Sequence, residues 1–226
     1  MTPLPRFLAG AAEPERPRLR KRERTRLALI DAAVRVFSSR GFAAATMQEI
    51  AAEAGMTTGT LYNHFDAKAD IVAAVAIAIA QTMQERSSAR RDSLSRGVER
   101  VAMGCQHYLW LAKQSPDWAL MLLDVAAATP AFLETVGAYV RADVRRGVRQ
   151  KEIEIESETA ALDLVCGSVM QGMRSIALGL APPRHGTAIT AMVLRGLGVP
   201  AEPARKIARK VLATVPGGDA GYRRGR

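Results

Sequence analysis

Polar side chains suited to contacting a nucleic acid are concentrated in one short segment, which runs from Thr57 to Lys68. If the segment begins with a helix, its outward side presents residues that can all hydrogen-bond and that include no acid: Thr57, Thr58, Thr60, Tyr62, Asn63 and His64. Such a helix can lie in the major groove of DNA and contact phosphates at the groove's edges. The segment therefore predicts DNA binding.

The other residues that commonly do chemistry form no recognisable catalytic or metal-binding set. Cys105 and His107 stand two residues apart, which separates them by about 200° around a helix, so they cannot share a metal ion. Cys166 lies in a helix rich in glycine and alanine and is expected to be a small buried residue. Two cysteines cannot build a disulfide framework and are typical of a reducing compartment. We therefore expect a cytoplasmic protein without catalytic residues, metal or cofactor.

Two short helices joined by a turn are the elements that must position the polar segment. Thr46 and Glu49 have the spacing of a capping box, which predicts a helix that ends near residue 54. Gly55 can adopt the left-handed conformation of a tight turn, and Thr57 then caps a second helix that ends near residue 63. This pair is a helix-turn-helix, and apolar residues at helical spacing over about 20–40 predict the helix before it.

Helical periodicity continues through the rest of the chain, and no strand pattern recurs. Asp66 is expected to cap a long helix over 67–88, and Ile153 to Ile155 is expected to be an extended connector. Further helices are predicted over 93–114, 117–127, 130–150, 158–181, 185–198 and 203–214. The predicted fold class is all-α with about nine to ten helices, divided into a three-helix DNA-binding domain over 21–66 and a helical ligand-binding and dimerisation domain over 67–215.

The chain carries 32 basic and 22 acidic side chains, and the excess lies at its two ends. Residues 1–26 hold 8 basic and 3 acidic residues, residues 201–226 hold 7 and 2, and the 17 of each sign between them cancel. We expect a disordered basic arm over 1–20 and a disordered basic tail over 216–226. The basic residues that lead into the first helix are either solvated or make salt-sensitive contacts with phosphates.

Residues 24–70 resemble the DNA-binding domain of the TetR family of bacterial transcriptional repressors. The matching residues occur in order along the segment: Ala32 to Phe42, Thr46, Ile50-Ala51, Ala54-Gly55, Gly59 to Tyr62, His64-Phe65 and Lys68. The rest of the chain resembles the family in length and in the number and order of its helices. The resemblance implies a homodimer that binds double-stranded palindromic DNA and releases it when a small molecule enters the C-terminal domain.

The DNA-binding candidates can now be named. They are Thr46, Thr57, Thr58, Gly59, Thr60, Tyr62, Asn63, His64 and Lys68. The resemblance implies that Thr46 holds a phosphate at the start of the first helix of the helix-turn-helix. It implies that the four residues from Thr57 to Thr60 approach the bases. It also implies that Tyr62, His64 and Lys68 contact the DNA backbone. Asn63 either joins them or faces solvent without a fixed role. Thr58 departs from the family, where a long side chain is common, and a threonine cannot make a bidentate contact with guanine.

Aromatic residues and methionines in the C-terminal half suggest where a ligand would bind. Both tryptophans and two of the four tyrosines fall between residues 93 and 150. Such residues, with a few polar groups, suit an adaptable apolar site for a small apolar or amphipathic effector. The candidates for the pocket are His107, Trp110, Trp118 and Met121. The alternative is that they are ordinary core residues.

Two late segments, 158–181 and 186–197, are apolar on more than one side and include several small residues. Together they could form a four-helix interface around a two-fold axis, which matches the symmetry of a palindrome. The candidate interface residues are Val165, Val169, Met173, Ile189, Met192 and Val193. The alternative is that both helices are internal core.

The function expected from the sequence is that of a DNA-binding transcriptional regulator, most simply a repressor released by a small effector. The main alternative is a regulator of the same fold that has no small-molecule ligand. An enzyme is disfavoured because no nucleophile constellation and no glycine-rich phosphate loop is present. A membrane protein is disfavoured because the longest apolar run, Ile71 to Ala80, is far shorter than the roughly 20 residues of a spanning helix.

Overall fold

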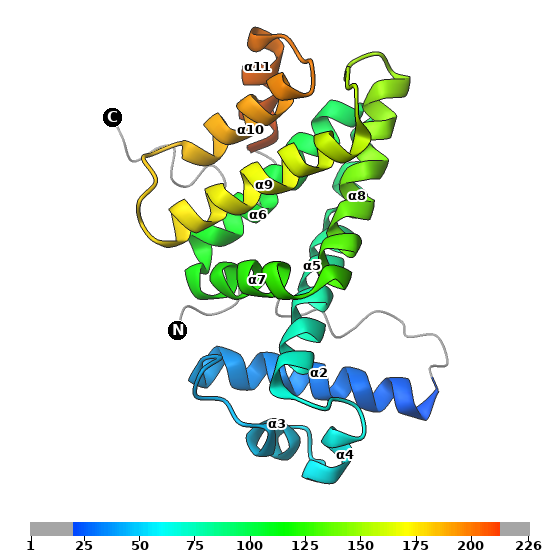
Figure 1. Ribbon diagram of the computed structural model, residues 1–226, viewed down its shortest axis with the longest axis vertical. Helices are drawn as coiled ribbons and strands as arrows, with labels where there is room; N and C mark the ends of the chain where they lie inside the picture. The colour runs from blue at the N-terminus through cyan, green and yellow to red at the C-terminus, as the bar shows by residue number, and fades with distance from the viewer. Residues whose placement is uncertain (1–19, 213–226) are drawn as a thin grey trace.

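The computed structural model describes residues 20–212, without the side chains of 86–93, and its regular structure there is entirely helical (Figure 1). The helices are α2 (Lys21–Arg40), α3 (Met47–Glu53), α4 (Thr58–Tyr62), α5 (Lys68–Ser93), α6 (Gly97–Gln114), α7 (Pro116–Ala128), α8 (Pro130–Arg149), α9 (Glu158–Ala177), α10 (His185–Gly196) and α11 (Ala201–Leu212). The all-α prediction is confirmed. The arm predicted over 1–20, apart from Arg20, and the tail predicted over 216–226 lie outside the described residues.

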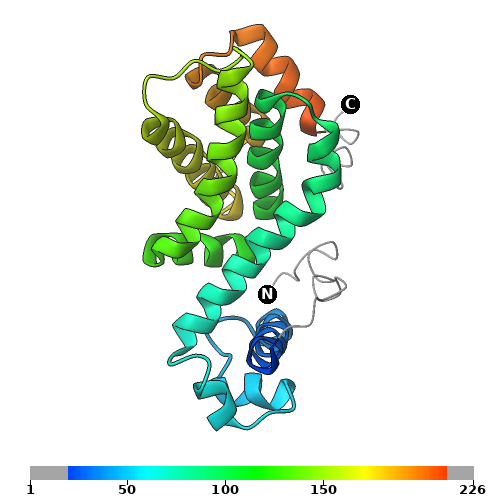
Figure 2. The same cartoon turned by 90° about the vertical axis from the view of Figure 1, so that its right-hand side faces the viewer.

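Helices α2, α3 and α4 form a small domain at one end of the molecule (Figures 1 and 2). The predicted capping box is confirmed: the Thr46 hydroxyl accepts from the Glu49 N–H at 3.2 Å, and the Glu49 carboxylate accepts from the Thr46 N–H at 3.0 Å. Gly55 takes the turn between α3 and α4 with a φ of 68°, and the Thr57 hydroxyl caps α4 by accepting from the Thr60 N–H at 3.2 Å. Local sequence signals therefore account for both ends of the turn.

The long helix α5 connects this domain to the rest of the molecule, and Figure 2 shows it running between the two. It begins at Lys68 (Lys68–Ser93), one residue after the start predicted over 67–88, and it continues beyond the predicted end. Asp66 was the wrong cap, since Asp70 in the first turn reaches back and accepts from the Ala67 N–H at 2.8 Å. An acidic side chain at this position accepts a hydrogen bond from a free amide, and its negative charge interacts favourably with the positive end of the helix dipole.

Helix α6 is the centre of the larger bundle and contacts α7, α8, α9, α10 and α11. Its closest approach to α8 is at Gly97, where an added Cβ would overlap the backbone of Gly147 and the carbonyl of Asp143. Residues 153–155 link α8 to α9 without regular structure, and the Glu154 N–H donates to the Leu197 carbonyl at 3.0 Å.

Within residues 20–212 no single helix is long and apolar enough to cross a membrane, and α7 with α8 reaches that composition only as a pair bent by 104°.

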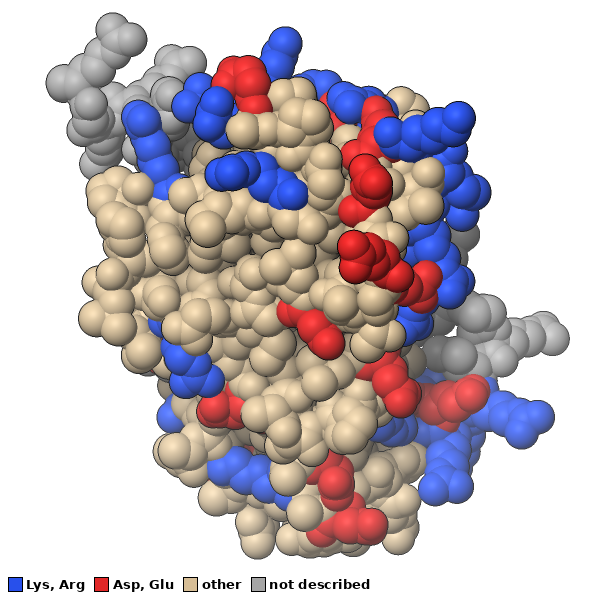
Figure 3. Space-filling model, turned by 45° about the horizontal axis from the view of Figure 1, so that its top comes forward, with Lys and Arg blue, Asp and Glu red and all other residues tan. Residues whose placement is uncertain are grey.

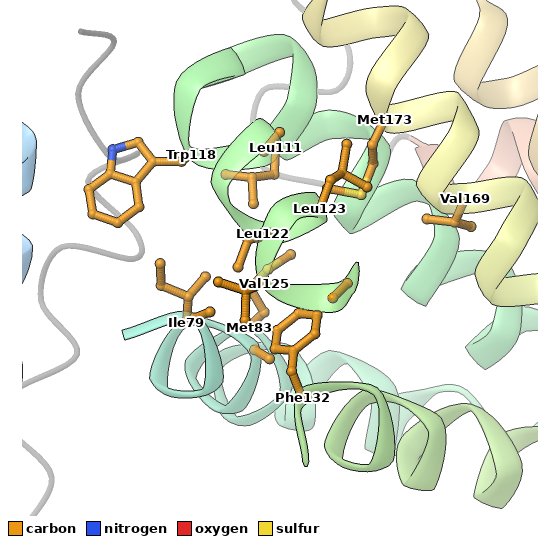
Figure 4. Close-up of a cluster of buried hydrophobic side chains, with 14 of the residues drawn as sticks. Ile79, Met83, Leu111, Trp118, Leu122, Leu123, Val125, Phe132, Val169 and Met173 are labelled. Carbon is orange, nitrogen blue, oxygen red and sulfur yellow. The ribbon is translucent and has the colours of Figure 1, made fainter. Parts of the chain in front are cut away.

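The small domain meets the bundle through three aromatic rings. Phe42, in the turn after α2, has its ring centroid 5.1 Å from that of Phe37 and 5.0 Å from that of Trp118, which it meets edge-on. Trp118 lies on α7, is completely buried, and has an indole N–H without an acceptor in the described part of the chain. Figure 4 shows the Trp118 ring on the side of α7 that faces away from Val169 and Met173. One helix therefore contacts the DNA-binding domain with one side and the bundle interior with the other.

Candidate DNA-binding helix and ligand cavity

Helix α4 presents a short polar surface at the end of the molecule. Tyr62 and Asn63 are exposed, whereas Leu61 is buried beneath them. Four residues make up the start of the helix. Thr57 and Gly59 are exposed, and Thr58 and Thr60 are half-buried. The hydroxyls of Thr57 and Thr60 lie 3.0 Å apart and share a hydrogen bond. The leading edge of α4 is thus capped, uncharged and accessible.

Two further candidates hold the surroundings of α4 in place. Thr46 is exposed at the start of α3, where its hydroxyl is engaged in the capping box. The Lys68 ammonium donates to the Ala43 carbonyl at 3.0 Å, which ties the start of α5 to the turn after α2. Because Lys68 already has this backbone acceptor, a phosphate would have to share the ammonium with Ala43. An ammonium has three donors, so both contacts are chemically compatible.

The basic start of α2 lies beside the end of α4. Arg26 stacks on Phe65 with its guanidinium carbon 4.9 Å from the ring centroid. Burial, and then the nearby charges of Arg22 and Arg26, hold the pKa of His64 below its usual value. The sequence prediction included these two arginines only as part of a basic run. Helical spacing of four residues puts them on one side of α2, and that signal could have singled them out.

A cavity of about 100 Å³ lies inside the bundle, between α5, α6, α7, α8 and α9. Its walls are mainly aliphatic and aromatic, including Leu122 and Leu123 of α7 and Phe132 of α8. Figure 4 shows Met83, Phe132, Leu123, Val169 and Met173 gathered from these helices. Such a cavity is large enough for a small apolar molecule.

Only one of the four predicted pocket residues lines this cavity, and that residue is His107. Trp118 and Met121 are buried elsewhere in the core, and Trp110 packs partly buried against it. These three lie away from the cavity because the rotation of α6 and α7 about their axes is set by tertiary packing. Trp118 is instead used at the junction between the two domains.

Two tyrosines and two cysteines were missed, and they lie close together in the cavity wall. They are Cys105 and Tyr108 of α6, Tyr139 of α8 and Cys166 of α9. Burial raises the pKa of the Cys105 thiol to about 12, with Cys166 adding to the effect. Burial, followed by Cys166 and Tyr139, raises the pKa of Tyr108, and burial followed by Asp163 raises that of Cys166. These three groups are therefore neutral at physiological pH.

The predicted dimer residues are mostly internal to a single chain. Val165, Val169 and Met173 line the cavity, and Val193 is buried against the core. Ile189 packs beside Gly172 between α10 and α9. Met192 alone faces outward, with 67% of its surface exposed. For all but Met192, this placement agrees with the alternative that these residues are internal core.

The outer side of α9 and α10 carries its own apolar surface. Leu164 of α9 and Met192 of α10 are exposed large apolar side chains, and Leu178 and Leu180, in the segment that follows α9, are exposed as well. The Leu164 side chain packs against Gly196 of α10, where an added Cβ would overlap its end. Figure 3 shows a broad area with few charged side chains on the face that includes these helices.

Among the described residues no group of three His, Cys, Asp or Glu side chains is placed to hold a metal ion.

Comparison with known proteins places both parts of the chain. Residues 29–75 match the model of the bacterial regulatory proteins of the tetR family, and residues 97–210 match that of the tetracyclin repressor-like C-terminal domain. The transcriptional regulator SrpR of Pseudomonas putida is 26% identical over 166 residues, which cover 68% of this chain and 77% of SrpR. TtgR, also of Pseudomonas putida, is 35% identical over 91 residues, 39% of this chain and 40% of TtgR.

Solved structures extend the similarity over the full fold. RolR in complex with resorcinol has a TM-score of 0.72 and 27% identity, over 83% of this chain and 94% of RolR. A TetR-family regulator from Pectobacterium atrosepticum has a TM-score of 0.60 and 29% identity, over 81% of this chain and 94% of that protein.

Proposed function

Because this chain belongs to the TetR family of bacterial regulatory proteins, we propose that it is a transcriptional repressor that leaves a palindromic operator when a small molecule occupies its cavity. Its curated relatives are regulators, a class without enzymatic activity. The proposed place of action is the cytoplasm, where the operator is found. The proposed contacts with DNA are those named from the sequence, with Arg22 and Arg26 added.

The observation that carries the DNA-binding part is the arrangement around α4. A capped helix with no acidic residue stands exposed at one end of the molecule, and the arginines of α2 flank its end. Threonines and a glycine at its leading edge allow close approach to base edges, and the arginines would hold the phosphates on either side. Without a long side chain at Thr58, we expect recognition to favour thymine methyl groups over bidentate guanine contacts.

A second copy of the chain is the proposed occupant of the outer face of α9 and α10. One helix-turn-helix contacts too few bases for useful specificity, and a two-fold dimer places two of them on successive turns of one groove. The exposed apolar side chains of this face supply a surface of the kind that homodimers bury. The pairing would join two helices from each copy into a four-helix interface.

The cavity is the proposed effector site, and RolR, whose structure contains resorcinol, supports it as a similar protein with a ligand. Leu122 and Leu123 line the cavity from α7, and Trp118 on the same helix touches Phe42. A ligand that prefers one position of α7 would therefore shift the DNA-binding domain. It can do so only to the extent that its affinity differs between the DNA-bound and released conformations.

Selection of bound DNA from a random pool tests this proposal in one experiment. We expect an inverted repeat whose half-sites lie about 10 base pairs apart, or a multiple of that spacing, centre to centre. Enrichment of a single unrepeated half-site, or of no sequence at moderate salt, would contradict the proposal.

A further inference from the structure

Sulfur is unusually concentrated around the cavity. The chain has nine methionines and two cysteines, and five of these eleven side chains line this one space. They are Met83, Cys105, Cys166, Met170 and Met173, contributed by α5, α6 and α9. Sulfur is polarizable and makes favourable contacts with the edges of aromatic rings, and methionine adjusts its shape to a flat guest. A wall of this composition favours an aromatic ligand over an aliphatic one of the same size.

The same wall carries two tyrosine hydroxyl groups. Tyr108 and Tyr139 are both half-buried and both line the cavity. The two tyrosines come from α6 and α8 and lie near each other, since Tyr139 is among the groups that raise the pKa of Tyr108. Because Tyr108 stays protonated at physiological pH, its hydroxyl is available as a donor. An oxygen atom on the ligand would satisfy it.

The cavity also limits the size and charge of the ligand. An apolar cavity of roughly 150 Å³ holds benzene, and the volume here is about 100 Å³. One ring therefore fits after small movements of the methionines. The charged side chains in the lining are one cation and one acid, Arg100 and Asp143, so the wall has no net charge to offer an anion. Moving an anion from water into such a site is costly.

We propose that the ligand is an uncharged molecule with a single aromatic ring that carries an oxygen acceptor, held with its ring against the sulfur atoms and its oxygen beside Tyr108 and Tyr139. This inference rests on the proposed function only in taking the cavity as the effector site. The nature of the ligand follows from the side chains of the cavity alone.

Four probes of similar size separate the elements of this proposal: phenol, toluene, cyclohexanol and benzoate. Calorimetry with the full chain measures binding directly, without DNA. We expect phenol to bind roughly tenfold more tightly than toluene, which lacks the oxygen. We expect a loss of about threefold or more with cyclohexanol, which lacks the aromatic ring. Benzoate should not bind at concentrations that saturate with phenol.

Variants of the full chain assign these preferences to named residues. Tyr139→Phe should reduce the preference for phenol over toluene by about fivefold, because one hydroxyl is removed without loss of the ring. Met173→Leu should reduce the preference for phenol over cyclohexanol while it conserves volume. Met121→Leu is the matched control, since Met121 is equally buried but does not line the cavity. Ratios of affinities are compared in proteins with unchanged melting curves.

The possible results separate this proposal from the proposed function. Equal binding of phenol and cyclohexanol, tighter binding of benzoate, or no binding of any probe at millimolar concentration would overturn the ligand class. Release of selected DNA by a different compound would then leave the repressor function intact. If the chain instead binds phenol as expected but no DNA, the proposed function fails and the ligand class stands.

Discussion

His64 lies between the proposed DNA-binding surface of α4 and the basic start of α2, so its protonation should respond to DNA. In the free protein, burial and the charges of Arg22 and Arg26 hold the pKa of His64 below its usual value. A phosphate beside the ring acts in the opposite direction and favours the protonated form. The complex then holds more protons than the free protein. We therefore expect affinity for the operator to rise as pH falls from about 7.5 to about 6, by at most about tenfold per unit for one proton.

Fluorescence anisotropy with labelled operator at constant ionic strength measures this dependence. NMR titration of the His64 ring should show a higher pKa in the complex than in the free protein. His64→Gln should flatten the dependence, whereas His185→Gln, at the start of α10 and far from α4, should leave it unchanged. An equal slope in wild type and His64→Gln would show that another group takes up the proton.

At the scale of helices, the crossing of α6 and α8 holds two walls of the cavity together. Gly97 has no room for a Cβ, because the space is filled by the backbone of Gly147 and the Asp143 carbonyl. Backbone atoms cannot rotate away as a side chain can, so Gly97→Ala must push the helices apart. We expect it to lower the free energy of unfolding by about 2–3 kcal/mol.

The control for this substitution lies in α8 itself. An added Cβ at Gly137 meets no atom within 4 Å, and alanine is the better helix former by about 0.5–1 kcal/mol. Gly137→Ala should therefore stabilise the protein slightly. Urea denaturation followed by circular dichroism compares the two, and a Gly97→Ala variant as stable as wild type would disprove the close crossing.

The contact between Phe42 and Trp118 is the second feature at this scale. Edge-to-face aromatic pairs are worth about 0.5–1.5 kcal/mol beyond the area that they bury. A double-mutant cycle with Phe42→Leu and Trp118→Phe should return a coupling energy of this size in the free energy of unfolding. We also expect these variants to release DNA only at a higher concentration of phenol, or of any established effector, than the wild-type protein. Additive effects in both measurements would mean that the contact transmits nothing.

How far the sequence could predict the molecule depends on the range of the forces involved. The helix-turn-helix was predictable because its signals are local. Thr46 and Thr57 each accept a hydrogen bond from an amide three residues later, and Gly55 itself adopts the positive φ of the turn. The cap of α5 was not, because Asp66 and Asp70 are both plausible locally and only the geometry of the turn decides between them. The cavity was the least predictable part. A helix that is apolar on several sides gives no local signal for its rotation. Trp118, expected in the pocket, therefore lies against Phe42, and Met173, expected in the interface, lines the cavity.

At the scale of the whole molecule, the exposed α4 and the outer face of α9 and α10 lie on different parts of the surface (Figure 1). A second copy can therefore cover the apolar face without blocking either DNA-binding helix. Since both copies must engage one duplex, operator affinity should depend on dimerisation even though no residue of that face touches DNA. A substitution on α10 can separate the two functions.

Met192→Asp places a carboxylate at the centre of the proposed two-fold interface, where two such charges would be desolvated and would repel each other. We expect dimerisation, and with it affinity for the inverted repeat, to weaken by about a hundredfold or more. Binding to a single half-site should be unchanged, because α4 is untouched. Val148→Asp is the control, since Val148 is also exposed and apolar but lies on α8. Sedimentation velocity over a range of protein concentrations gives the oligomeric state, and anisotropy gives both DNA affinities. A Met192→Asp protein that remains a dimer at submicromolar concentration would show that the two copies meet elsewhere on the surface.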